Sequence, residues 1–513
     1  MSLNIPEAYP LYASASRHIQ MIKFILNEQT LETDLPKGVT VLDFARYHKN
    51  LKGTKIGCRE GDCGACTILV GELVGEKVKY RTQTSCLMPL ANAHGKHLVT
   101  IEGINRPNGE LTEVQRAMVD ESGTQCGFCT VGFVMSLTGF CLDETEKTGE
   151  SAISAIDGNI CRCTGYKSIE RAAENLTEVL NQNNGESRID FAVAKSIVPD
   201  SFNAIKSRLE SLQSNHAGKS AETENRLPEN AEKFGVEDGS DDGYPKTRIK
   251  TSKPFVGGGT DLYVQNPEEM VYAKEAENLF SDLELKFINE SEEFIEIGAA
   301  VVVTDLLESE IFNRLFPNLY KHLKLVSSTP IRNMATIAGN FVNASPIGDM
   351  TAWFLALDAS IVFNTEREIP LREFYLGYKT LLKAEDEFIT RIRFRKDFTH
   401  FNFEKVSKRT YLDISTVNTA ISLKTENNRI LEAHASAGGV APIPLYLKKT
   451  SEFLRGREIS DATVSEASEI LQSEIAPISD VRGSETYKRL LARQLFTAHF
   501  VKLFGITTND EKV

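Results

Sequence analysis

Apolar and polar positions alternate along this chain with several different periods, and each period predicts a different type of secondary structure. The apolar run Ile22–Leu26 predicts a strand, and the runs Thr67–Val70 and Val78–Tyr80 predict two more. A helix is expected to begin near Val41, and a glycine-rich loop follows it. The N-terminal part is therefore predicted to be a small unit of strands with one helix.

A helical period begins at Thr112, where Val114, Met118 and Val119 recur at the spacing of residues that face a core. Further helices are predicted at 152–156 and 169–179. The segment Ser122–Leu142 carries no charge and is about long enough to cross a bilayer. Because it contains three cysteines, several glycines and several hydroxyl side chains, we interpret it as a buried helix and not as a membrane span.

The composition changes again between about Asn181 and Lys250, where Asn, Ser, Glu, Gly and Asp dominate. Such a segment cannot bury enough apolar surface to offset the entropy of ordering it. We therefore expect residues 186–250 to form a largely irregular interdomain linker, with one helix near Phe202–Leu212.

Two runs of small and polar residues follow the linker. Apolar alternation returns at Lys253–Val256 and leads into Gly257–Leu262, where glycines allow backbone amides to approach a diphosphate. The second run, Ile331–Asn340, continues to Asp349. Together they suit a cofactor that carries phosphates and hydroxyls, although neither a GxGxxG nor a Walker A motif is present. Further strands are predicted at 420–424 and 430–437, and further helices at 463–471 and 485–503.

Length and charge narrow the class of protein. The 513 residues are enough for three or four domains. With 58 basic and 71 acidic residues the formal net charge is −13, which argues against a nucleic-acid surface. Residues 1–20 show no recognisable targeting pattern, so we expect a cytoplasmic protein without membrane attachment.

Eight of the nine cysteines form two quartets. The first follows the C-x4-C-x2-C…C spacing that binds a plant-type [2Fe-2S] cluster, and its members are Cys58, Cys63, Cys66 and Cys86. The second pairs a CxxC with a CxC, and its members are Cys126, Cys129, Cys161 and Cys163. Three glycines in Gly57–Cys66 permit positive φ, so that backbone N–H groups can point at sulfur and raise a cluster's reduction potential.

A structural zinc site and disulfides are two other uses of such thiols. A structural zinc ion also takes four cysteines, but its tight pattern repeats CxxC on both sides, whereas Cys86 stands alone after strand-like residues. Disulfides would require an oxidising compartment. Iron–sulfur binding is therefore the favoured interpretation. Cys141, the ninth thiol, is expected to be a buried apolar residue.

With these motifs, the chain resembles the molybdenum hydroxylase family. The stretches similar to its two iron–sulfur domains are Gly57–Cys66, Gln125–Gly132 and Asn159–Tyr166. The stretches similar to its flavin module are Gly257–Leu262, Arg332–Asn340, Ser345–Asp349 and Asp480–Arg489. The order of these modules on one chain resembles that of xanthine dehydrogenases. Because the chain ends where a molybdenum domain would begin, it resembles the small subunit of a bacterial two-subunit form.

The resemblance implies a multidomain α+β fold. Its expected parts are a β-grasp [2Fe-2S] ferredoxin domain at 21–103, an all-α helical-bundle [2Fe-2S] domain at 104–185, the linker at 186–250, an α+β FAD-binding domain of the molybdenum hydroxylase and vanillyl-alcohol-oxidase-like type at 251–395, and a C-terminal α+β flavoprotein domain at 396–507.

The resemblance also implies an electron route. A purine would be hydroxylated at a molybdenum–pterin centre on a large partner subunit, and electrons would pass through the helical-domain cluster, the β-grasp cluster and FAD to NAD⁺. It implies a dimer of heterodimers and no catalytic acid, base or nucleophile on this chain. The same role with an aldehyde or another N-heterocycle, and with a non-NAD acceptor, stays open because these residues do not encode the substrate.

For the flavin, the resemblance assigns residues of the two small-residue runs and three isolated positions. They are Val256, Gly257, Gly258, Gly259, Thr260, Asp261, Leu262, Thr336, Ile337, Ala338, Gly339, Asn340, Asp349, Ile389 and Lys405. In this assignment Asp349 accepts from hydroxyls, Lys405 lies near the isoalloxazine, and Asp413 shapes the approach of NAD⁺. One departure is Val326, which stands where xanthine dehydrogenases commonly place an aromatic residue against the flavin.

Overall fold

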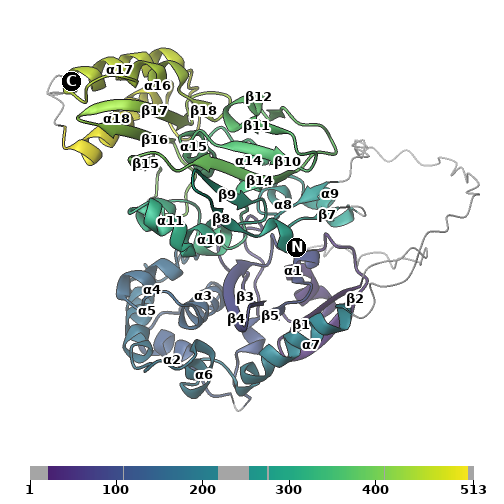
Figure 1. Ribbon diagram of the computed structural model, residues 1–513. Coiled ribbons are helices and arrows are strands. Elements are labelled where there is room, and N and C mark those ends of the chain that lie inside the picture. The colour runs from purple at the N-terminus through teal and green to yellow at the C-terminus, as the bar shows by residue number, and fades with distance from the viewer. Residues whose placement is uncertain (1–20, 108, 218–253, 274–275, 410, 507–513) are drawn as a thin grey trace, which may run out of the picture.

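The computed structural model describes residues 21–107, 109–217, 254–273, 276–409 and 411–506. Figure 1 shows an N-terminal half, in purple and blue, below a C-terminal half in green and yellow. Each half combines helices with strands, so the predicted multidomain α+β architecture is confirmed. Residues 1–20 and 218–253, which include much of the expected linker, lie outside the described residues.

The first sheet belongs to the N-terminal half. Its strands are β1 Ile22–Leu26, β2 Gln29–Thr33, β3 Thr67–Val74, β4 Lys77–Thr84 and β5 His97–Val99. The order is β2-β1-β5-β3-β4, with β1 parallel to β5 and the other neighbours antiparallel. The helix expected near Val41 is a single turn, α1 Val41–Asp43, which continues as the wider turn Phe44–His48. Thr40 begins it by accepting the Asp43 N–H.

Five helices follow this sheet. They are α2 Glu113–Asp120, α3 Thr130–Leu142, α4 Gly149–Ala155, α5 Lys167–Leu180 and α6 Arg188–Ala194. Helix α3 is buried on almost every side because β3 and β4 pack against it opposite α4 and α6. This placement explains its uncharged sequence. None of the described helices is both long and apolar enough to span a membrane.

Two expectations for this half are corrected. Val119 was expected to face the core with Val114 and Met118, but it is 53% exposed because it lies one position past Met118 and turns away from that face. The linker was expected from residue 186, but α6 and a 3-10 turn over Asp200–Ala204 continue the fold there. The helix expected near Phe202–Leu212 is present as α7 Ile205–Ala217.

Helix α7 packs back onto the first sheet (Figure 1). Its residues Ile205, Leu209 and Leu212 recur on one face and bury against Ile25 of β1. The Arg208 guanidinium donates to the Glu28 carbonyl beside it. An apolar stripe within a polar composition is therefore what orders this part of the expected linker.

The C-terminal half begins with a mixed domain. Its strands are β6 Phe255–Val256, β7 Glu277–Asn278, β8 Ile288–Glu290, β9 Phe294–Gly298, β10 Ser360–Phe363, β11 Glu368–Pro370, β12 Tyr375–Gly377, β13 Thr380–Leu381 and β14 Ile389–Arg395. Its helices are α8 Leu262–Gln265, α9 Pro267–Tyr272, α10 Val303–Glu308, α11 Glu310–Leu315, α12 Leu319–Leu323, α13 Thr329–Arg332, α14 Ile337–Asn343 and α15 Asp349–Leu355. The main sheet has the order β11-β10-β14-β9-β8.

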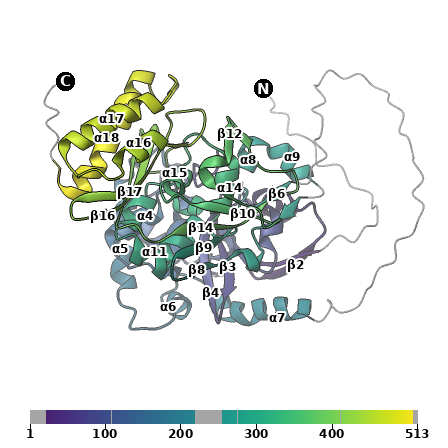
Figure 2. The same cartoon turned by 45° about the horizontal axis from the view of Figure 1, so that its top comes forward.

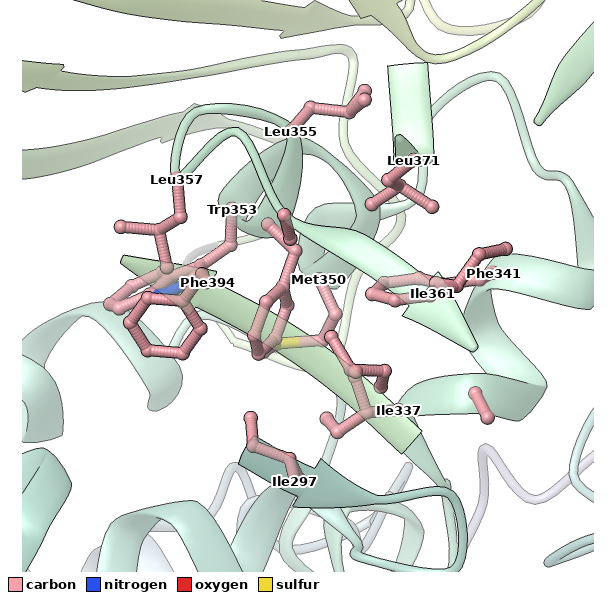
Figure 3. Close-up of a cluster of buried hydrophobic side chains, with 14 of the residues drawn as sticks. Ile297, Ile337, Phe341, Met350, Trp353, Leu355, Leu357, Ile361, Leu371 and Phe394 are labelled. Carbon is pink, nitrogen blue, oxygen red and sulfur yellow. The ribbon is translucent and has the colours of Figure 1, made fainter. Parts of the chain in front are cut away.

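The core of this domain lies between its main sheet and helices α14 and α15. Figure 3 shows Ile297 from β9, Ile337 and Phe341 from α14, and Trp353 from α15 converging in one cluster. Phe403 and Ala420 of the next domain belong to the same cluster. The last domain has a core of its own and contributes these two residues to the core of its neighbour, so the two domains are packed together.

The last domain is a four-stranded antiparallel sheet covered by helices. Its strands, in spatial order, are β15 His400–Val406, β16 Val417–Glu426, β17 Arg429–Gly438 and β18 Leu445–Tyr446. Its helices are α16 Lys448–Leu454, α17 Asp461–Glu474 and α18 Glu485–Phe504. Figures 1 and 2 show these helices gathered on one side of the sheet, in contact with β15, β16 and β17. The strands and helices predicted here are confirmed.

One segment fastens the C-terminal half to the N-terminal half. Arg332 forms an ion pair of 2.7 Å with Asp157, and both side chains are almost fully buried. The Asn333 amide donates to the Thr82 carbonyl at 2.8 Å, and Met334 lies in the core beneath the first sheet. The sequence suggested a cofactor loop here. Its first residues instead hold the halves together.

Candidate redox site

The first cysteine quartet lies on the loop before β3 and directly after β4. Left-handed backbone at Arg59, Gly61 and Gly64, with φ of 57°, 79° and 67°, folds this loop tightly. Its amides point at sulfur: the Glu60 N–H lies 3.3 Å from the Cys58 Sγ, and Cys58 and Cys63 each donate an N–H to the other's Sγ at 3.4 Å. The expected direction of the loop amides is therefore confirmed.

Within this quartet the thiols are associated in pairs. Contact with Cys63 lowers the pKa of Cys58 to about 5, and contact with Cys86 lowers the pKa of Cys66. The pKa values of Cys63 and Cys86 are raised by the same contacts. One sulfur of each pair is thus ready to act as a thiolate, which is the form that binds metal.

An ion pair fixes the loop that carries Cys58. The Arg59 guanidinium donates to both carboxylate oxygens of Asp43, at 2.7 and 3.1 Å. Asp43 is buried, and the Thr40 hydroxyl donates to it at 2.9 Å. A bidentate pair of this kind is geometrically specific. It holds Arg59 in its left-handed conformation, and therefore holds Cys58 in place.

The second quartet lies at the ends of helices, as the sequence indicated. Cys126 and Cys129 precede α3, and Cys161 and Cys163 lie between α4 and α5. The Cys163 and Cys126 sulfurs are 3.7 Å apart, and both residues are exposed. Burial and the neighbouring Cys161 raise the pKa of Cys129 to about 12.

Thr164 supports one sulfur of the second quartet. Its hydroxyl oxygen lies 3.0 Å from the Cys161 Sγ, and its N–H lies 3.4 Å from the same atom. Although burial opposes the change, these hydrogen bonds lower the pKa of Cys161. Tyr166 adds a further constraint, because its hydroxyl accepts the Cys161 N–H at 3.1 Å.

The pairwise arrangement of the thiols bears on the kind of metal centre. Among the described residues, no three His, Cys, Asp or Glu side chains converge on a point where one metal ion could bind. Each quartet instead gathers as two pairs, 58 with 63 and 66 with 86, then 126 with 163 and 129 with 161. Two pairs of thiolates suit a centre with two irons, each bound by one pair.

A cleft of about 520 Å³ opens in the first domain of the C-terminal half. Such a volume is within the range of small-molecule and cofactor sites. The residues expected at the flavin that line it are Gly257, Gly258, Gly259, Thr260, Asp261, Leu262, Thr336, Ala338, Gly339, Asn340 and Ile389. The fold therefore brings together the two small-residue runs, which are about 80 residues apart in the sequence.

Glycine is required at this cleft for packing as well as for ligand approach. A Cβ on Gly258 would lie 1.8 Å from the Met334 carbonyl oxygen. Gly259 has φ +83° and packs against the Leu87 carbonyl, directly after Cys86. The wall of the cleft is thus in contact with the segment that carries the first quartet.

Four of the expected flavin residues do not line this cleft. Val256 and Ile337 are buried in the cores on either side. The Lys405 ammonium is 1% exposed and donates to Asp349 at 2.7 Å and to the Leu325 and Asp413 carbonyls at 2.7 and 2.9 Å. Lys405 is therefore a buried lysine with three protein acceptors and not a solvated lysine of the surface.

Asp349 has protein donors on both of its oxygens. Besides Lys405 on Oδ2, its Oδ1 accepts from Ser415 at 2.5 Å and from Asn418 at 2.6 Å. Val326, at the position where an aromatic residue was expected, is buried, and its carbonyl accepts from Arg332. Neither residue presents a free polar group to the cleft.

The sequence did not point to several residues that line the cleft. Lys379, in the turn between β12 and β13, donates to the Asn343 carbonyl and side-chain oxygens. Asn343 donates to Asp261 at 2.8 Å, and burial raises the pKa of that carboxyl. The Phe388 ring lies 5.0 Å from the Phe255 ring, with the two planes tilted by 43°. These residues come together only through folding, and no local motif marks them.

Four protein-family models match the chain in sequence. They are a 2Fe-2S iron-sulfur cluster binding domain at residues 24–91, a [2Fe-2S] binding domain at 100–174, an FAD binding domain in molybdopterin dehydrogenase at 246–394, and a CO dehydrogenase flavoprotein C-terminal domain at 403–503. The fold and these matches define the class of the protein. It is an iron–sulfur flavoprotein with domains for two [2Fe-2S] clusters and for FAD.

The curated relatives narrow the class to a family. The chain is 29% identical to the xanthine dehydrogenase of Emericella nidulans (93% of this chain, 38% of the relative). It is 29% identical to that of Blastobotrys adeninivorans (95% and 41%) and 26% identical to xanthine dehydrogenase 1 of Arabidopsis thaliana (92% and 38%). Together with the four domain matches, these relatives support the assignment of the chain as the iron–sulfur and FAD region of a molybdenum hydroxylase.

The chain spans about two fifths of the length of these curated relatives. Among solved structures, the quinoline 2-oxidoreductase of Pseudomonas putida 86 overlaps 49% of this chain and 88% of its own chain, with 22% identity and a TM-score of 0.45.

Proposed function

We propose that this chain is the electron-transfer and flavin subunit of a xanthine dehydrogenase. In this function electrons from hypoxanthine or xanthine, oxidised at a molybdenum centre on a partner subunit, pass through two [2Fe-2S] clusters to FAD and then to NAD⁺. A [2Fe-2S] centre handles single electrons, and a flavin collects two before a hydride leaves. The proposed partners are a large molybdenum-cofactor subunit and NAD⁺, in a dimer of heterodimers.

The observation that carries this proposal is the succession of contacts between the three sites. The N–H of Ile160, next to Cys161, donates to the carbonyl of Cys63 in the first quartet. Leu87, next to Cys86, packs against Gly259 in the wall of the cleft. The second quartet, the first quartet and the cleft therefore adjoin in that order. Exposure of Cys126 and Cys163 supports entry of electrons at the second quartet.

The proposal gives each group of residues a task. The iron ligands are Cys58, Cys63, Cys66 and Cys86 for one cluster and Cys126, Cys129, Cys161 and Cys163 for the other. The loop amides and Thr164 orient the sulfurs and stabilise their negative charge. The cleft residues would bind and orient FAD, and the Lys405 and Asp349 pair stabilises the fold near Leu325 and Asp413.

Metal and flavin analysis tests the first part of this proposal. The purified chain is expected to hold about four irons and one flavin, and after dithionite reduction it should show two distinct S = 1/2 EPR signals. A colourless protein that contains zinc would contradict the proposal.

Turnover tests the second part. When the chain is produced together with a molybdenum-cofactor subunit, the complex should convert xanthine to urate and reduce NAD⁺. Iron- and flavin-loaded complex that oxidises only an aldehyde or another N-heterocycle would reassign the substrate and leave the electron route intact.

One observation favours an alternative acceptor. Val326 occupies the position where xanthine dehydrogenases commonly place an aromatic ring, and it is buried in the core. Anaerobic titration with NADH separates the two cases. Rapid bleaching of the flavin by NADH supports NAD⁺ as the acceptor, whereas bleaching only by an artificial donor supports the alternative.

A further inference from the structure

The loops that carry the two cysteine quartets are joined by a backbone hydrogen bond. The Ile160 N–H donates to the Cys63 carbonyl at 3.1 Å. Cys63 is itself a member of the first quartet, and Cys161 follows Ile160 directly. A continuous path of covalent bonds with this single hydrogen bond therefore joins the sulfur of Cys63 to the sulfur of Cys161.

The side chain of Asn159 forms hydrogen bonds to two neighbouring segments beside this backbone hydrogen bond. Its Nδ2 lies 3.3 Å from the Gly64 carbonyl oxygen, in the loop of the first quartet. Its Oδ1 accepts from the Ser136 hydroxyl on α3 at 2.7 Å. Asn159 is 5% exposed and immediately precedes Ile160. One amide thus connects both cluster loops to a helix that is buried between them.

The surroundings leave no room for a side chain between the two loops. A Cβ on Gly64 would lie 2.3 Å from the Gly158 carbonyl oxygen and 2.4 Å from the Asn159 Nδ2. A Cβ on Gly132 of α3 would lie 2.2 Å from the Gly64 carbonyl oxygen. Glycine at both positions lets three backbones meet at the point where Asn159 binds.

We propose that Asn159 is a positioning residue that sets the electronic coupling between the two clusters, because it holds the Ile160 N–H on the Cys63 carbonyl. This inference rests on the proposed function. In the step that it serves, one electron leaves the reduced cluster of the second quartet, which becomes oxidised, and reduces the cluster of the first quartet. No proton is transferred, and no covalent bond forms or breaks.

Asn159→Leu and Asn159→Asp in the full chain test this role. Leucine removes both hydrogen bonds at similar size. Aspartate still accepts from Ser136 but places a carboxylate oxygen against the Gly64 carbonyl, so it breaks only the link between the loops. Thr138→Val is the matched control, because Thr138 is equally buried on α3 but its hydroxyl donates within the helix, to the Val134 carbonyl.

The readout is the exchange splitting, which is transmitted through bonds, that each reduced cluster imposes on the EPR signal of the other, measured together with iron content. The expected result is full iron content and both signals in every variant, with most of the splitting lost in both Asn159 variants and kept in Thr138→Val. An unchanged splitting in iron-loaded Asn159→Leu and Asn159→Asp would overturn the inference. Loss of iron from both Asn159 variants, with the control intact, would overturn it too, because Asn159 would then be a purely structural residue.

The same measurements separate this inference from the proposed function. If the unmodified chain lacks iron or shows fewer than two signals, the proposed function fails. If the unmodified chain shows two mutually split signals that the Asn159 variants leave unchanged, only the role of Asn159 fails.

Discussion

The two quartets present the same four thiols in different surroundings. In the first quartet Cys66 and Cys86 are buried in the core beneath a sheet, and loop amides point at Cys58 and Cys63. The second quartet lies at helix ends, where Cys126 and Cys163 are exposed.

This difference shows how one ligand set can serve two positions in a relay. A site enclosed by its own fold exchanges electrons through its neighbours within the chain. A site at the surface can approach a partner. Because reduction potential depends on solvent exposure and on hydrogen bonds to sulfur, the two sites are also expected to differ in potential.

The largest expected effect comes from removing one ligand of each quartet. Cys86→Ala and Cys163→Ala should each reduce the iron content from about four to about two per chain and eliminate one EPR signal. Cys86→Ala should also lower the melting temperature far more, because Cys86 is buried in the core and metal binding there contributes to folding free energy. Iron analysis, EPR and thermal melting measure this.

Cys141→Ala is the control, since Cys141 is fully buried but belongs to neither quartet. It should retain all iron and both signals. Equal melting temperatures in Cys86→Ala and Cys163→Ala would remove the contrast between an enclosed and an exposed site.

The second-largest expected effect concerns the flavin cleft. Among the described residues, the first quartet is the one that adjoins this cleft. Gly258→Ala places a Cβ 1.8 Å from the Met334 carbonyl oxygen, in the core shared with the first sheet. It should destabilise the chain by about 3 kcal/mol or more, with loss of FAD and retention of the second quartet's iron. Flavin fluorescence after denaturation and iron analysis test this.

Gly377→Ala is the matched control for that prediction. Its Cβ would meet nothing closer than Thr380, at 4.0 Å. Full flavin content in Gly258→Ala would show that the wall of the cleft yields to the extra carbon atom, and that the contact between the halves is not rigid.

The sequence predicted the quartets because iron coordination dictates the cysteine spacing. It also predicted the small-residue runs of the cleft. The burial of Lys405 could not be predicted, since it depends on Asp349, which is 56 positions away, and on two carbonyls that the fold supplies. The pairing of Asp157 with Arg332 is equally non-local.

The start of the linker could not be predicted from composition. The polar composition from residue 186 onward hides α6, whereas the periodicity of the following residues predicts the helix near Phe202–Leu212. Ile205, Leu209 and Leu212 have the spacing of a buried helical face, and Phe202 precedes them. The signal for α7 was thus present in the sequence. In contrast, nothing local marked Lys379 or Phe388 as residues of the cleft.

Acid should affect the C-terminal half more than the N-terminal half. Burial lowers the pKa of His97 in the first sheet to about 4, and in the C-terminal half it lowers those of His322 and His499 to about 4 and about 3. Between pH 6.5 and about 4 the unfolded state binds these protons and the folded state does not. Stability is therefore complete above pH 6.5 and is lost as the pH falls.

Each histidine contributes a slope of up to about 1.4 kcal/mol per pH unit in that window. Burial also lowers the pKa values of His400 and His434, so among the described residues the C-terminal half has four such histidines against His97 alone and should show the steeper loss. Urea unfolding followed separately by flavin fluorescence and by iron–sulfur absorbance, at pH 7, 6 and 5, measures both slopes. His499→Gln should flatten the flavin-detected slope, and an unaltered slope would assign the acid effect to other groups.

The smallest predicted effect is a shift of one reduction potential. The Thr164 hydroxyl lies 3.0 Å from the Cys161 Sγ, and towards an iron-bound thiolate it must donate. Thr164→Val removes this bond, which is worth about 0.5–1.5 kcal/mol. Because 59 mV corresponds to a tenfold change for one electron, the potential of the second cluster should fall by about 20–60 mV.

Thr130→Val provides the control for this shift. Its hydroxyl is close to the second quartet but bonds to Thr124 at 2.6 Å and not to sulfur. EPR-monitored redox titration should show a lower potential for the second cluster in Thr164→Val alone, with the first cluster unchanged in both variants. A shift in the reduction potentials of both clusters would mean that Thr164 acts through the contact between Cys63 and Ile160. No shift would leave solvent exposure as the source of the difference between the two quartets.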